Sequence, residues 1–135
     1  MKRQPLRAIH LIVAAVTAST LVAVAVSEAR QKPGEMQQCG TVKGPEFVYQ
    51  GRTKKGTTYT VQAMGMRCSL SRAWAPEMAS RPVGSSVTRL KPPERDWECW
   101  GERVFEDNTK AVRGACGRTA GANTQLFDWG PVRTD

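Results

Sequence analysis

The four cysteines of this 135-residue chain constrain its fold more than any other feature, and they are Cys39, Cys68, Cys99 and Cys116. They are even in number, contain no Cys-x-x-Cys pair and follow an export-like segment, which together indicate two disulfides. A zinc site would need closely spaced ligands, usually with histidine among them, so we expect no metal and no cofactor. Four cysteines allow three pairings, and the choice depends on which strands pair.

The first 29 residues have the pattern of a signal peptide. Lys2, Arg3 and Arg7 precede an apolar run over residues 8–26, and Ser27-Glu28-Ala29 supplies the small residues that a cleavage site prefers. Cleavage before Arg30 would leave about 106 residues, enough for one domain. We therefore expect a secreted or cell-envelope protein. The alternative is an uncleaved anchor, because the apolar run is long enough to cross a bilayer.

The mature chain is expected to form one domain over residues 39–130, between a flexible leader (30–38) and a polar tail (131–135). A first hairpin would pair a short strand at 47–49 with a strand at 57–64, across a turn-rich link at 51–56. Tyr59, Val61 and Ala63 alternate with polar residues in the second strand, which predicts that these three side chains share a buried face.

A helix is expected to follow Cys68, with Ser69 as its N-cap and with Trp74 and Met78 facing the sheet. Pro76 would remove a backbone hydrogen bond, so the helix should be two turns long or kinked. Residues 80–93 are rich in proline, serine and glycine, which predicts a surface loop or an edge strand around 87–90.

A second hairpin, with its turn at Asp107-Asn108, decides the cysteine pairing. One register pairs Val104 with Ala111, Glu102 with Arg113, Gly101 with Gly114 and Cys99 with Cys116. An opposite-charge pair across two strands is favourable, and two facing glycines leave room for close packing. This register predicts a Cys99–Cys116 disulfide and leaves Cys39 to join Cys68.

An apolar stretch at 126–129 predicts a last strand, and the expected fold class is α+β. It comprises a small antiparallel sheet of two hairpins plus this closing strand, packed on one short helix and held by two disulfides. The residues from Val61 to Cys68, with Arg72, Trp97-Glu98-Cys99 and Ala115-Cys116, resemble a group of small exported bacterial proteins, many of them actinobacterial. Those proteins share a strand followed by a Cys-x-x-Ala-Arg helix start, with serine replacing the alanine here. The resemblance covers roughly residues 57–117 and implies a fold but no activity, because the group is mostly uncharacterised.

The residue types exclude several mechanisms. His10 is the only histidine and lies in the signal segment, so nucleophiles that need an imidazole base and ordinary zinc hydrolase sites are excluded from the mature chain. Oxidised cysteines exclude a thiol nucleophile. The formal net charge of +8 favours acidic partners. The alternative is that the excess of basic residues serves only to keep the surface soluble.

Two places are candidates for a binding surface. The first hairpin tip gathers Arg52, Lys54 and Lys55, the one local concentration of positive charge. Trp97 and Trp100 fall on opposite faces of one strand, so one is expected to be buried and the other at least partly open, unless both are packed. An open tryptophan flanked by polar groups suits sugar stacking or partner contact, and we select Trp100.

The leading hypothesis is a non-enzymatic exported binding module for an acidic envelope polymer or protein. One alternative is a small hydrolase of envelope glycan that uses carboxylates such as Asp96 and Glu98, though no catalytic residue is assigned. Another is an inhibitor of a secreted acidic enzyme with residues 80–93 as its reactive segment, and a third is a purely structural envelope component. Nucleic acid is not expected as a partner, and membrane contact would require the uncleaved anchor.

Overall fold

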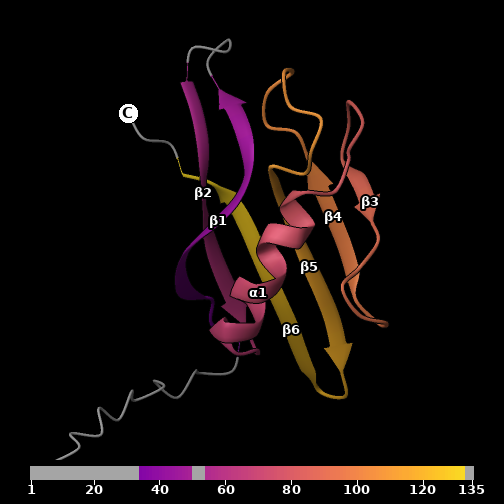
Figure 1. Ribbon diagram of the computed structural model, residues 1–135. Coiled ribbons are helices and arrows are strands. Elements are labelled where there is room, and N and C mark those ends of the chain that lie inside the picture. The colour runs from indigo at the N-terminus through magenta and orange to yellow at the C-terminus, as the bar shows by residue number, and fades with distance from the viewer. Residues whose placement is uncertain (1–33, 50–53, 133–135) are drawn as a thin grey trace, which may run out of the picture.

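The computed structural model describes residues 34–49 and 54–132, which form a six-stranded antiparallel sheet and one helix (Figure 1). The elements in chain order are β1 (Gln37–Tyr49), β2 (Lys54–Met64), α1 (Cys68–Ala79), β3 (Thr88–Leu90), β4 (Glu98–Glu102), β5 (Arg113–Ala120) and β6 (Asn123–Pro131). The strand order in the sheet is β1-β2-β6-β5-β4-β3. A sheet and a short helix agree with the α+β class. The last strand, β6, lies in the middle of the sheet and also forms a hairpin with β5.

The first hairpin is confirmed, with a longer first strand than expected. Tyr59, Val61 and Ala63 are fully buried, as the alternation predicts. β1 begins at Gln37, inside the range assigned to the leader, and its register against β2 shifts twice, between Gln38 and Thr41 and between Lys43 and Phe47. The Tyr59 hydroxyl donates to the Pro45 carbonyl at 2.7 Å, and burial raises the pKa of Tyr59 to about 12. This buried contact holds the bulged part of β1 against β2.

α1 crosses the front of the sheet in Figure 1 and is longer than expected. The N-cap is Arg67 rather than Ser69, and the 12 residues of the helix continue through Pro76. Burial of the helix on both sides of Pro76 outweighs the hydrogen bond that proline cannot make, because Ala75, Met78 and Ala79 are all buried in the core. Trp74 faces the sheet as predicted, and its ring lies 5.3 Å from that of Trp97.

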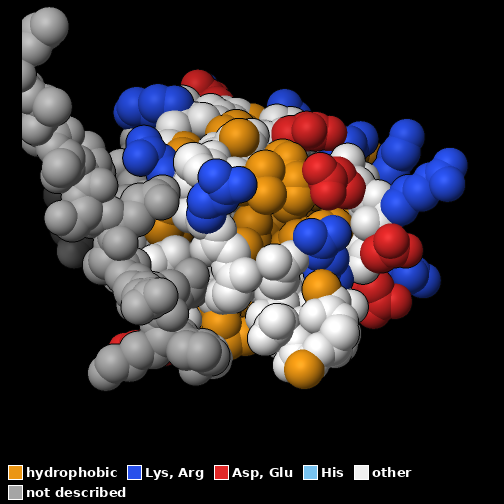
Figure 2. Space-filling model, turned by 90° about the horizontal axis from the view of Figure 1, so that it is seen from below, with side chains coloured by type: hydrophobic (Ala, Val, Ile, Leu, Met, Phe, Trp, Pro, Cys, Tyr) orange, Lys and Arg blue, Asp and Glu red, His pale blue; other side chains and the backbone are white. Residues whose placement is uncertain are grey.

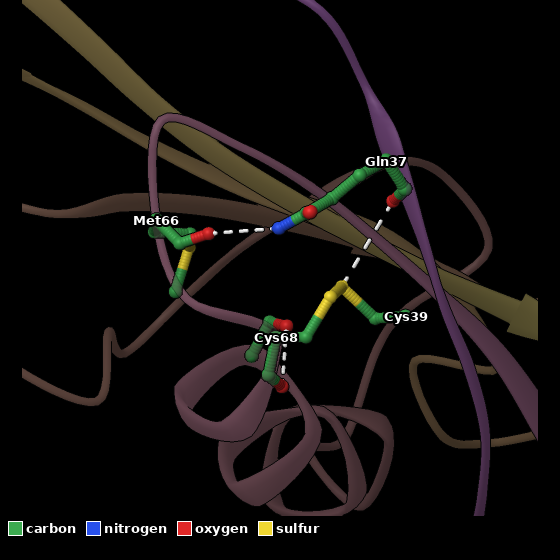
Figure 3. The surroundings of a disulfide bond; sticks show 5 residues. Gln37, Cys39, Met66 and Cys68 are labelled. Carbon is green, nitrogen blue, oxygen red and sulfur yellow. Dashed lines mark hydrogen bonds between the residues drawn. A yellow bond between two sulfur atoms is a disulfide. The ribbon is translucent and has the colours of Figure 1, made fainter. Parts of the chain in front are cut away.

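Both disulfides have the predicted pairing. Cys99 pairs with Cys116 across β4 and β5, in the same register that joins Gly101 to Gly114. The Cys39–Cys68 disulfide connects β1 to the first residue of α1. Beside it the Gln37 side chain crosses to donate a hydrogen bond to the Met66 carbonyl at 3.2 Å, so β1 is held to the chain entering the helix at two points (Figure 3).

The tight turn at Asp107-Asn108 and the Val104–Ala111 pair were wrong. β4 ends at Glu102, β5 begins at Arg113, and residues 103–112 form a loop instead. Asn108 is buried in that loop, only 5% exposed, because its side chain binds the backbone of β1. Its Oδ1 accepts from the Val48 N–H at 2.9 Å, and its Nδ2 donates to the Val48 carbonyl at 2.8 Å. The loop thus supplies hydrogen-bond partners for the backbone N–H and carbonyl of one residue of β1, the edge strand.

We expect Asn108→Ala to lower the free energy of unfolding by about 1–3 kcal/mol, because both backbone groups of the half-buried Val48 would lose their side-chain partner. Urea denaturation followed by circular dichroism measures the change. Thr109→Ala is a matched control, since the neighbouring Thr109 is exposed and contributes its backbone carbonyl to Val83. Equal stability of the two variants would show that the Asn108 contact does not hold the edge strand.

The core lies between α1 and one face of the sheet. Its largest fully buried side chains include Trp129, Tyr59, Phe47, Phe127 and Met78. The indole Nε1 of Trp129 donates to the Ala111 carbonyl at 2.7 Å, which fixes that ring inside the core. No helix within residues 34–49 and 54–132 is long and apolar enough to cross a membrane. The apolar segment before residue 30 lies outside the described residues.

Candidate binding face

The face of the sheet opposite α1 carries a row of side chains across its centre, and we call this surface the open face. Trp100 on β4 pairs with Ala115 on β5, and Ala115 pairs with Asp128 on β6. Directly opposed residues of antiparallel strands point to the same side. Their sequence neighbours Cys99, Cys116 and Phe127 are buried in the core, so the row itself points outward.

The two tryptophans near β4 have opposite surroundings, which confirms that they lie on opposite sides of the sheet. Trp97 is 3% exposed and packs its ring edge-on against Trp74, with the Arg118 guanidinium 4.9 Å from its centroid. Trp100 is 46% exposed on the open face. The alternative in which both tryptophans are packed is therefore wrong, and Trp100 is available for contact.

Two shallow hollows lie on either side of Trp100. The first, of about 730 Å³, includes Glu98, Gly117 and Leu126 in its lining, and the second, of about 450 Å³, includes Glu102, Arg113 and Gly130. Trp100 and Ala115 line both hollows. The indole therefore stands as a ridge between two depressions in one surface.

The floor of each hollow contains a glycine that the fold does not require. A Cβ on Gly117 would meet its nearest atoms at 3.5 Å or more, and one on Gly130 would lie 3.8 Å from the Arg113 side chain, both ordinary contacts. Neither residue has a positive φ. By contrast, a Cβ on the core-facing Gly114 would lie 2.3 Å from the Trp129 ring. Missing side chains at Gly117 and Gly130 help to keep the hollows open.

Charges around Trp100 are mostly paired with each other. Arg89 Nη2 lies 3.3 Å from Glu98 Oε1, and Arg89 Cζ lies 5.9 Å from the centroid of the Trp100 ring. Arg113 forms an ion pair with Glu102. Asp128 lies half-buried on β6, opposite Ala115. Burial raises the pKa of Asp128 above its usual value, while a hydrogen bond from the Gln62 backbone partly opposes that rise. The open face thus has alternating donors and acceptors around an aromatic ring.

The hairpin tip and Trp100 do not form one surface. Lys54 lies over the Tyr49 ring at 6.0 Å and Lys55 forms a 3.0 Å ion pair with Glu46, while Arg52 lies outside the described residues. In the part of the chain that the structure describes, neither lysine lines a hollow. Figure 2 shows the end of the molecule opposite this tip, and there too basic and acidic side chains are interspersed around hydrophobic ones.

Asp96 and Glu98, the carboxylates considered for hydrolysis, both border the first hollow. Both residues are exposed, and Glu98 is engaged by Arg89. A general acid in glycoside hydrolysis needs an environment that keeps it protonated, usually burial in an apolar pocket. Among the described residues, no cluster of three or more possible metal ligands occurs.

Sequence reasoning missed the residues that β5 and β6 contribute. Asp128 and Gly130 join the open face only because β6 pairs with β5, whereas Ala115 and Gly117 lie on β5, whose register with β4 places Ala115 opposite Trp100. The signal that could have found them is the short segment at Gly121-Ala122, which joins two runs of similar length as a hairpin turn.

No family model, curated protein or solved structure matches this chain. The resemblance to small exported bacterial proteins therefore remains an expectation from the sequence.

Proposed function

We propose that this protein is an exported, non-enzymatic binding module that contacts its partner through the open face. The observation that carries the proposal is Trp100, a large aromatic side chain that is 46% exposed between two hollows. Tryptophan is strongly enriched among residues that dominate binding energy. Its neighbours on the open face are charged and small residues, so packing within the chain does not account for its position.

The cysteines support the proposed compartment. Both disulfides form within one small domain, which is typical of proteins from oxidising, extracytoplasmic environments. The signal-peptide pattern of residues 1–29 supports export to the same compartment. The partner is therefore expected in the cell envelope or outside the cell.

Retention on isolated cell envelopes of the producing organism tests the proposal. We expect the secreted protein to be retained and Trp100→Ala to reduce retention about tenfold, the effect of losing a central aromatic contact. Leu70→Ala is the matched control, because Leu70 is 39% exposed on α1, away from the open face. Equal retention of the wild type and Trp100→Ala would refute the open face as the contact surface.

Two further arms separate this proposal from the alternatives. Retention that disappears at high salt and in Lys54→Gln/Lys55→Gln, but not in Trp100→Ala, would assign attachment to the hairpin tip instead. Release of soluble fragments from the envelope, lost in Glu98→Gln, would show that the protein is a hydrolase and overturn its non-enzymatic assignment.

A further inference from the structure

We infer that the ligand of the open face is an uncharged glycan chain that lies along the strands and stacks one sugar ring on Trp100. This inference rests on the proposed function and names its ligand class. It draws on the charge balance of the hollows, the chemistry of their linings, their spacing and the two glycines in their floors.

The charge balance of the open face argues against an acidic polymer. The linings of the two hollows include four carboxylates, Asp96, Glu98, Glu102 and Asp128, and two arginines that lie on the open face, Arg89 and Arg113. Both arginines already neutralise carboxylates on the same face. A polyanion would therefore find no excess of positive charge here, whatever the net charge of the chain.

The chemistry of the linings fits a sugar better than a protein partner. A protein hot spot usually lies in an apolar core that excludes water, with polar groups at the rim. Here the Arg89 guanidinium lies 5.9 Å from the centroid of the indole ring, and charged and threonine side chains line both hollows. A pyranose ring with equatorial hydroxyls offers a C–H face to an aromatic ring and hydroxyls to its surroundings. Arginine donors and carboxylate acceptors on both sides of Trp100 match those hydroxyls.

The spacing of the hollows sets the length of the ligand. Glu98 and Glu102 lie in different hollows, four residues apart on β4, with Trp100 midway between them. At about 3.3 Å per strand residue they are separated by about 13 Å, enough for about three sugar rings in a linear chain. The middle ring would stack on Trp100, and its two neighbours would occupy the hollows.

Gly117 and Gly130 support this placement because glycine weakens a strand interior. Neither the backbone conformation nor the neighbouring atoms demand glycine at these positions. A side chain at either one would project into a hollow. Each glycine thus weakens its strand but leaves room for a ligand that lies flat against the sheet.

Titration with cellohexaose and chitohexaose, followed by calorimetry and by quenching of the protein's tryptophan fluorescence, tests the inference. We expect at least one of these neutral hexasaccharides to bind, and hexagalacturonate, an anionic probe, to bind at least tenfold more weakly. Trp100→Ala, Gly117→Thr and Gly130→Thr should each weaken binding about tenfold or more. Gly84→Thr is the matched control, because a Cβ at Gly84 meets no atom within 4 Å and the residue lies outside both hollows.

Urea unfolding of each variant ensures that weaker binding is not a loss of fold. No binding of either neutral hexasaccharide, tighter binding of hexagalacturonate, or unchanged binding by both threonine variants would overturn the inference. If envelope retention depends on Trp100 while both neutral hexasaccharides fail to bind, the proposed function stands and the glycan assignment falls. If Trp100→Ala is retained on envelopes as well as the wild type, the proposed function itself falls.

Discussion

Replacing Cys99 and Cys116 together by alanine is expected to lower the free energy of unfolding by about 3 kcal/mol. The disulfide joins residues 17 positions apart, and in the chain-entropy model its loss frees a loop of that size in the unfolded state. Both side chains are fully buried, so truncation would also leave a small cavity. Urea denaturation of the oxidised proteins measures the difference.

The other disulfide provides the comparison for this prediction. Cys39 and Cys68 are 29 positions apart. In the chain-entropy model, the loss of stability in Cys39→Ala/Cys68→Ala should therefore exceed that in Cys99→Ala/Cys116→Ala only slightly, by about 0.4 kcal/mol. If Cys99→Ala/Cys116→Ala instead loses more stability than Cys39→Ala/Cys68→Ala, the difference comes from the burial of Cys99 and Cys116. A Cys99→Ala/Cys116→Ala protein as stable as the wild type would contradict the stabilising role of that disulfide.

Gly114→Ala is expected to destabilise the protein by about 3 kcal/mol or more, or to prevent folding. A Cβ at this position would lie 2.3 Å from the Trp129 ring and 2.4 Å from the Trp100 carbonyl oxygen. The Trp129 indole is held in the core by its hydrogen bond to Ala111, so relieving the overlap would require core and backbone to shift. Expression yield and urea denaturation measure the effect.

Gly117→Ala, three residues further along β5, is the matched control. It should change the stability by less than about 1 kcal/mol, and towards greater stability, because alanine restricts the unfolded chain and meets only ordinary contacts here. Similar losses in both variants would show that β5 tolerates no side chain on either face. That result would also remove the argument that Gly117 is free to change.

Local patterns predicted those parts of the fold that depend on nearby residues. The pairing of Cys99 with Cys116 followed from several complementary pairs in one register, and the burial of Tyr59 followed from strict alternation. The pairing of β2 with β6 joins segments more than 60 residues apart, and period-two patterns carry no information about such partners. β5 itself has the sequence RGACGRTA, whose glycines and alanines give a weak strand signal.

For the candidate site, too, only the features that depend on nearby residues were predictable. Alternation around Cys99 was enough to put Trp100 and Trp97 on opposite faces. Net charge, however, does not show where charges gather or how they are paired, and Lys55 proved to be neutralised by Glu46. Asp128 and Gly130 could not be assigned to the site before the position of β6 was known.

The alternation along β4, β5 and β6 has a consequence for changing specificity. In the central part of these strands the outward residues have a neighbour in sequence that belongs to the core, as Trp100 has Cys99 and Asp128 has Phe127. Substituting only the outward residues would change the open face while leaving both disulfides and the aromatic core intact. The same scaffold could therefore acquire new ligands by substitutions at alternate positions, without insertions or a rebuilt interior.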